Sequence, residues 1–295
     1  LQEIVDFLNA RARENQWGFV DFNRPMVAIN QWEQAEDSMY TLCGKDRIHP
    51  STDGHLVMAY LFLKAQGLAG KPVADIRIDG AGKKVTRSDN CRVSDLSVSS
   101  DNLTFTYEAK SLPYPIDTSY YDNEKHTQAD ALSVIPFMDE MNYEGLSVSG
   151  LSDGYYGLTI GGEFIGRFTA RELERGINMA LLQNTPQYKQ AMKIRQMNEE
   201  RWLKERKMRE FYWVEYNLMR KTGMLWACNE AAVDTLRKYR PHDIFLQWNG
   251  DLWLQYMHKG IREDCVNEQQ DLVNRIYEQN KPIPLRIEIK KFTDL

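Results

Sequence analysis

The period of the hydrophobic pattern changes twice along the chain, and these changes divide it into three parts. Apolar residues recur with helical spacing over residues 1–68, interrupted by one short apolar run, and alternate with polar residues over 71–168. Helical spacing returns at residue 169 and dominates to about residue 280. A period of 3.6 residues is typical of helices and a period of two is typical of half-buried strands. We therefore expect an α/β piece in residues 1–68, a small β-sandwich in 71–168 and a helical extension in 169–295.

The first part has the order helix, strand, helix, turn, helix. Residues 1–16 carry an apolar helix face made of Leu1, Ile4, Val5 and Leu8. Residues 18–22 are mostly apolar and predict a parallel strand buried on both sides. Asn23 is the expected N-cap of a helix to about Glu36, with Pro25 in its first turn. A third helix is expected from His55 to Lys64, with Gly67 as its C-cap.

This order is typical of the closing unit of a doubly wound α/β domain. Residues 1–68 are too few to bury a parallel sheet on both faces. We therefore expect the sheet to be completed by residues outside this chain, or the segment to dock on another surface.

Strand and turn signals fill the middle part. Alternating runs predict strands at 73–78, 103–107 and 156–160, and Gly161-Gly162 predicts a hairpin into 163–168. Residues 112–130, rich in Tyr and Asp, predict a long loop.

The third part begins with a helix start signal, since Thr169 and Glu172 have the spacing of a capping box. Residues 187–220 predict one long helix with the i,i+4 pairs Glu200/Lys204 and Glu205/Arg209 on its outer face, and 285–289 alternates like a strand.

The composition excludes several function classes. The formal net charge is -5, which does not favour nucleic acid as a partner, and no apolar run approaches the length of a membrane helix. The long helix 187–220 is basic and aromatic, but its acids and bases are interleaved, which is typical of a solvated amphipathic helix.

The four cysteines, Cys43, Cys91, Cys228 and Cys265, form no CxxC motif, so no metal site is expected. The spacing of these cysteines is compatible with one or two disulfides and with free thiols.

The chemistry-bearing motif is Asp46-Arg47-Ile48-His49-Pro50, on the turn before the third helix. A hydrolytic serine needs a histidine to accept its proton, and that histidine needs a carboxylate on its other ring nitrogen. Asp46 and His49 lie three residues apart on one tight turn and can meet this requirement locally. The pair therefore predicts an orienting acid and a general base.

With its flanking helices, the apolar run 19–22 and Gly54-His55, this motif resembles the C-terminal block of the SGNH/GDSL esterase family. The resemblance covers residues 1–68 and implies a flavodoxin-like three-layer domain, with Asp46 and His49 as two members of a catalytic triad. The family's Gly-Asp-Ser nucleophile block and the remaining oxyanion-hole residues are absent here, and Ser51, directly after the turn, does not replace them. Residues 156–180 are similar to the β-sandwich and helical extension of bacterial SGNH hydrolases.

The resemblance implies a serine esterase acting on acyl or acetyl esters, with carbohydrate esters as one substrate class. It implies no cofactor, an N-terminal segment of the same hydrolase as partner, and a secreted or periplasmic location. The isolated chain is expected to be inactive because it lacks the nucleophile. Two other interpretations stay open: a non-catalytic module that binds carbohydrate or a protein partner through the β-sandwich, and one half of a nicked protein.

The remaining histidines predict no second site. His55 is expected to pin the turn, and His126, His242 and His258 are isolated in the sequence and expected to be surface or satisfied residues. Cys43 lies near the motif, and a buried free thiol is expected there.

Overall fold

The computed structural model describes residues 1–119 and 126–292 and has a mixed α/β fold with two sheets. It divides into two compact units, residues 1–189 with 282–295 and residues 190–281. This division differs from the expected boundary at residue 168, because residues 177–178 still pair with a strand of the first unit. The strand after the helical region also returns to that unit.

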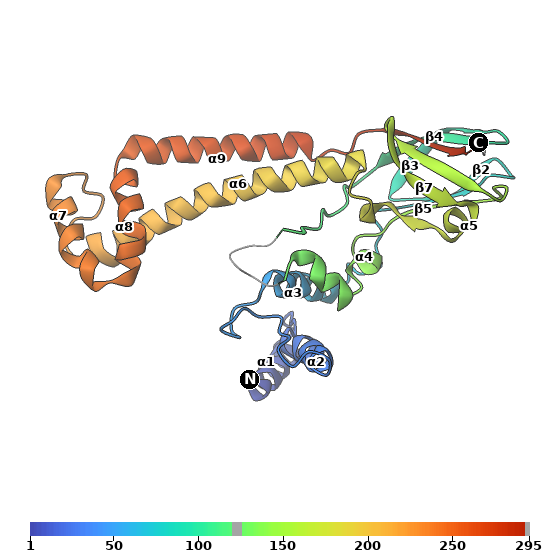
Figure 1. Cartoon of the computed structure of the whole chain (residues 1–295). Helices are drawn as coiled ribbons and strands as arrows, with labels where there is room; N and C mark the ends of the chain where they lie inside the picture. Colours follow the sequence, from blue (N-terminus) through green and yellow to red (C-terminus); the bar gives the residue numbers. More distant parts are fainter. Residues whose placement is uncertain (120–125, 293–295) are drawn as a thin grey trace. The chain divides into compact units, whose positions relative to one another are not determined.

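In the described part of the first unit, nine strands make a sandwich (Figure 1). One sheet has the order β2-β1-β5-β8 and the other β3-β4-β9-β6-β7. The strands are β1 (Ala74–Asp79), β2 (Lys84–Asp89), β3 (Cys91–Val98), β4 (Asn102–Ala109), β5 (Glu144–Ser149), β6 (Tyr155–Ile160), β7 (Glu163–Thr169), β8 (Ile177–Asn178) and β9 (Leu285–Lys291). The predicted strands and the Gly161-Gly162 hairpin are confirmed, and both glycines have the positive φ that such a turn requires.

Strand β9 lies in the middle of the five-stranded sheet. It pairs antiparallel with both β4 and β6, so that Ile289 lies opposite Leu103 on one side and Leu158 on the other. Its buried residues alternate with outward-facing polar ones, as the period of two predicted. The expectation that it belongs with the helical region is wrong, because its apolar face completes the sandwich core.

Helices surround a second core in the first unit. These are α2 (Asn23–Glu33), α3 (Thr52–Ala65), the 3-10 helix η1 (Gln128–Ser133) and α4 (Phe137–Glu140). Helix α1 (Gln2–Asn15) contacts α2 through the ion pair between Asp6 and Arg24. Leu56, Val57 and Tyr60 of α3 pack with Phe137 and Met138 of α4. Helix α3 ends in a Schellman motif, in which Gly67 N–H donates to the Lys64 carbonyl and Leu68 N–H donates to the Leu63 carbonyl. The C-cap is Gln66, and the predicted Gly67 is the left-handed residue directly after it.

Two local predictions in this region are wrong. Residues 18–22 form no strand, because the described part of the chain places no neighbouring strand there to accept their backbone hydrogen bonds. Asn23 is the first residue of α2 and not its N-cap; Asp21 instead accepts the backbone N–H of Arg24 at 3.0 Å. Part of the expected 112–130 loop, residues 120–125, lies outside the described residues.

The predicted capping box opens the short helix α5 (Ala170–Arg175), where the Thr169 hydroxyl accepts the Glu172 N–H. The 3-10 helix η2 (Met179–Leu181) follows it.

The second unit is helical. It contains α6 (Pro186–Val214) from residue 190 onward, the π-helix η3 (Glu215–Met219), α7 (Glu230–Tyr239), the 3-10 turn η4 (Arg240–His242), α8 (Ile244–Tyr256) and α9 (Lys259–Gln279). Helices α6 and α9 run side by side (Figure 1), joined by the ion pair Lys204–Glu268 at 2.6 Å. The long helix predicted over 187–220 is confirmed, with a π-helical C-terminal turn.

Candidate active site

The turn that carries Asp46 and His49 is closed by its own backbone. Gly44 N–H donates to the His49 carbonyl at 2.8 Å, and Ser51 N–H donates to the Leu42 carbonyl at 3.0 Å. The Asn30 side chain of α2 accepts the Leu42 N–H at 2.9 Å, and the Leu42 side chain is fully buried. The base of the turn is therefore held by α2 and by the second core of the first unit.

Asp46 organises the tip of the turn. One carboxylate oxygen, Oδ1, accepts the backbone N–H of Ile48 at 2.9 Å and of His49 at 3.1 Å. The other, Oδ2, lies 2.5 Å from His49 Nδ1. Arg47, between them, adopts a left-handed φ of 57°, which bends the chain back toward Asp46. The structure thus brings the two predicted residues into direct contact.

The electrostatics of the pair favour an ionised acid. The hydrogen bond from His49, followed by those from the two backbone N–H groups, lowers the pKa of Asp46 to about 2. Because an ionised carboxylate only accepts hydrogen bonds, Nδ1 of His49 carries the proton. Nε2 then remains as the basic nitrogen for an outside partner, and the side chain is 83% exposed.

Gly54 lets α3 approach the turn. A Cβ at this position would lie 2.0 Å from the Leu42 carbonyl oxygen and 3.3 Å from the Pro50 ring. Only a residue without a side chain allows this contact. The Gly54 in the motif therefore fixes the distance between the turn and the first turn of α3.

A nucleophile is not placed beside His49. In the described part of the chain, no hydrogen bond joins the His49 ring to a serine, threonine or cysteine side chain. The Ser51 hydroxyl is buried and donates to the Asp53 carboxylate. Cys43 is half-buried, and burial raises the pKa of its thiol. Neither group is positioned for attack on a substrate at His49.

A neighbouring acid was missed at the sequence level. Asp53 is 1% exposed, and its Oδ2 lies 3.7 Å from Nδ1 of His126. The His126 ring also makes an edge contact with Tyr40, with ring centroids 5.7 Å apart. The ring of His126 therefore contacts both the Asp53 carboxylate and the Tyr40 ring, although the residue is isolated in the sequence. The sequence separation of 73 residues between Asp53 and His126 leaves no local signal for this contact.

The other histidines differ in their surroundings. His258 Nδ1 lies 3.3 Å from the Cys228 thiol, so it is not isolated either. His242 is exposed on η4, and His55 is exposed on α3. Asp46, and not His55, holds the turn together.

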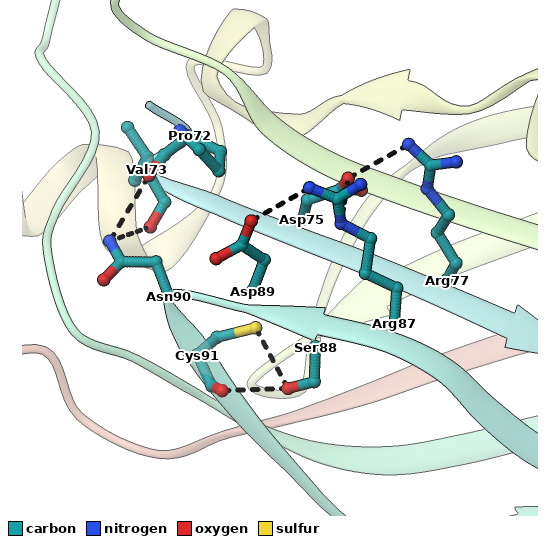
Figure 2. A network of polar contacts seen from close by, with 9 residues as sticks. All are labelled: Pro72, Val73, Asp75, Arg77, Arg87, Ser88, Asp89, Asn90 and Cys91. Carbon is teal, nitrogen blue, oxygen red and sulfur yellow. Dashed lines mark hydrogen bonds and ion pairs between the residues drawn. The ribbon is translucent and has the colours of Figure 1, made fainter. Parts of the chain in front are cut away.

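A second polar network lies on the β1–β2 hairpin (Figure 2). The Asp75 carboxylate, nearly buried, pairs with Arg77 at 3.1 Å and with Arg87 at 2.9 Å, and Arg87 also pairs with Asp89 at 2.9 Å. Asn90, in a left-handed conformation between β2 and β3, donates to the Val73 carbonyl. Because these groups satisfy one another, the network stabilises the hairpin and offers no reactive group.

Among residues 1–119 and 126–292, no cluster of three or more His, Cys, Asp or Glu side chains could hold a metal ion. All four cysteines are free thiols. No helix in these same ranges is long and apolar enough to cross a membrane.

Comparison with known proteins points to one group of enzymes. Residues 192–281 match the family model of the diltiazem deacetylase C-terminal helical domain. The chain is also similar to the solved structure of a gut microbial diltiazem-metabolizing enzyme, with 41% sequence identity and a TM-score of 0.91. The match covers 99% of this chain and 66% of that chain, so this chain spans just under two thirds of the length of the solved enzyme. No curated protein matches it significantly. The helical unit is thus similar to the C-terminal domain of a drug-metabolizing deacetylase.

Proposed function

We propose that this chain supplies the acid–base half of the active site of a serine ester hydrolase of the SGNH/GDSL type. The observation that carries the proposal is the Asp46–His49 hydrogen bond, with the ring of His49 exposed beyond it. Similarity to a diltiazem-metabolizing enzyme supports a hydrolase of this general kind.

In the proposed mechanism, a serine from a segment outside this chain attacks the ester carbonyl. His49 Nε2 accepts the serine proton and then delivers it to the leaving alcohol. A water molecule, whose proton His49 Nε2 accepts in turn, then attacks the acyl-enzyme and releases the acyl group as an acid. Asp46 stays ionised throughout, because its pKa of about 2 lies far below that of an imidazolium, and it stabilises the positive ring.

The partner that we propose is an α/β segment of the same hydrolase that bears the serine. Residues 1–68 expose several large apolar side chains, among them Leu1, Phe7, Trp17, Trp32 and, on the turn between Asp46 and His49, Ile48. The solved relative contains a further third of chain that has no counterpart here. Covering this surface would also exclude water from His49, which strengthens its interactions with a substrate.

The substrate class that we propose is acyl or acetyl esters, including acetylated carbohydrates. The match of residues 192–281 to the C-terminal helical domain of diltiazem deacetylase supports removal of an acetyl group. The substrate class is taken from these similar proteins. A secreted or periplasmic location is part of the same proposal, and fractionation of the source cells tests it.

The test is ester hydrolysis by a protein that includes both this chain and the nucleophile-bearing segment. His49→Ala should reduce hydrolysis of p-nitrophenyl acetate by roughly a thousandfold or more, because the serine loses its general base. The matched control is His55→Ala, an exposed histidine on α3 that should retain activity. A folded His49→Ala protein with wild-type turnover would exclude the assignment. The 295-residue chain alone should show no hydrolysis.

One observation favours the alternative of a binding module. Tyr155, Phe164 and Phe292 lie exposed on the outer face of the five-stranded sheet, where Arg167 stacks on Tyr155 at 3.9 Å. Aromatic faces of this kind suit the apolar face of a sugar ring. Retention of this chain on a polysaccharide, without hydrolysis by the intact protein, would favour this second function.

A further inference from the structure

A pocket of about 340 Å³ lies within the helical unit, between the π-helix and α8. Its apolar lining comes from four elements: Trp213 of α6, Leu218 of the π-helix, Tyr239 of α7 and Leu246 of α8. Lys221 and His242 also line it. A concave apolar site with a few convergent polar groups is the usual form of a small-molecule site, and the volume is at the lower end of the range for such sites.

The π-helix shapes one wall of the pocket. Arg220 N–H donates to the Glu215 carbonyl at 2.8 Å, five residues earlier, which widens the last turn of α6. The widened turn is held in place by the buried Glu215 carboxylate, which accepts the Trp253 indole N–H and the Trp226 backbone N–H, each at 2.8 Å. Such insertions cost helix stability and are found frequently at functional sites.

Aromatic contacts join Trp213 to α8. The Trp213 ring packs against Phe245 of α8, with centroids 5.2 Å apart. Phe245 in turn makes an edge contact with Trp248 at 5.5 Å. These contacts support the position of the Trp213 ring at the pocket.

The charged side chains that line the pocket favour an anionic ligand. Lys221 forms no ion pair with any residue in 1–119 or 126–292. The one carboxylate in the lining, Asp243, is the N-cap of α8 and accepts the N–H groups of Phe245 at 2.8 Å and Leu246 at 3.2 Å. Its negative charge therefore faces the positive end of a helix. The ammonium group of Lys221 is left for a ligand.

We propose that this pocket binds a small organic anion with an aromatic or aliphatic body, such as an aryl carboxylate. The body lies on Trp213, Leu218 and Leu246, and the acid group pairs with Lys221. The pocket lies wholly in the helical unit, so the inference is independent of the esterase proposal.

The test compares two probes on the full 295-residue chain by isothermal titration calorimetry. Anilinonaphthalene sulfonate carries an aromatic body and an anionic group, and phenylnaphthylamine has the same body without the charge. Lys221→Met keeps the alkyl stem and removes the ammonium group, so it should weaken the anionic probe about tenfold and leave the neutral probe unchanged. The matched control is Lys193→Met, an exposed lysine of α6 outside the pocket, which should change neither probe.

A variant that fills the pocket tests whether the two probes bind there. Asn217 lines the pocket on the π-helix, and Asn217→Trp should abolish binding of both probes. Circular dichroism confirms that each variant is folded. Equal loss of both probes in Lys221→Met would contradict the ion pair, and tight binding of both in folded Asn217→Trp would show that they bind elsewhere. Either result overturns the proposal.

Discussion

Glu144 makes the stability of the sandwich depend on pH. It is the first residue of β5 and is completely buried. Tyr107 Oη donates to its carboxylate at 2.8 Å, and Gln187 Nε2 donates at 3.2 Å. Among the described residues no cation acts on it, so burial dominates and raises its pKa to about 7, although both hydrogen bonds act in the opposite direction.

The sign and size of the effect follow from this pKa. The folded protein holds the Glu144 proton more tightly than the unfolded chain, whose glutamic acid has a pKa of 4.5. The stabilisation is complete below pH 4.5 and is lost as the pH rises through about 7. The difference between the two pKa values corresponds to about 3 kcal/mol of unfolding free energy.

Glu144→Gln replaces the acid with a neutral side chain of the same shape. Its carbonyl still accepts the Tyr107 hydroxyl. Its amide N–H can donate to Oε1 of Gln187, a buried atom that has no hydrogen-bond partner among the described residues, once the Gln187 amide rotates by half a turn. The variant should therefore lose the pH dependence and be more stable than the wild type above pH about 8, by up to about 3 kcal/mol.

Urea unfolding at pH about 5 and about 8, followed by a signal from the sandwich, measures this difference. The control is Glu140→Gln, because the pKa of Glu140 is lowered, first by its hydrogen bond from Lys64. That variant should lose the same stability at both pH values, because the stabilisation from an acid with a lowered pKa is already present at pH about 5 and is lost only as the pH falls below 4.5. If Glu144→Gln keeps the wild-type loss of stability between the two pH values, the reasoning is refuted, because another group must then be titrating.

Three further variants probe contacts that the structure makes specific. Gly54→Ala places a Cβ 2.0 Å from the Leu42 carbonyl and should cost about 1–3 kcal/mol, seen as faster hydrogen exchange in residues 42–51; unchanged exchange would mean that the contact is loose. Thr169→Val removes the capping box of α5 and should cost about 1 kcal/mol in thermal unfolding, and an unchanged melting temperature would contradict this. Glu215→Ala leaves the Trp253 indole N–H unpaired and should destabilise the helical unit by about 1–3 kcal/mol in urea; a neutral effect would argue against a structural role for this carboxylate.

Much of the secondary structure and the main site pair could be predicted from the sequence, since both depend on near neighbours. The capping box Thr169/Glu172, the Gly161-Gly162 hairpin and the C-terminus of α3 each depend on residues a few positions apart. Asp46 and His49 are in contact because a turn of four residues brings them together. Their catalytic roles stay a prediction, because no nucleophile accompanies them in the described chain.

The features that were predicted wrongly or not predicted depend on residues far apart in the sequence. Residues 18–22 have the composition of a buried strand, but a strand forms only where another strand accepts its hydrogen bonds. The contact between Asp53 and His126 joins segments far apart in the sequence, and no local pattern encodes it.

Periodicity and capping are local, so the amino-acid sequence predicts where most helices, strands and turns of this protein form. The fold is needed to show that β9 completes the first unit and that a pocket lies beside the π-helix. It also shows that, within residues 1–119 and 126–292, Glu144 is buried without a cation and Lys221 has no ion pair. Sheet pairing, burial and the charge state of a side chain depend on residues brought together across long stretches of chain. Those contacts exist only once the chain has folded.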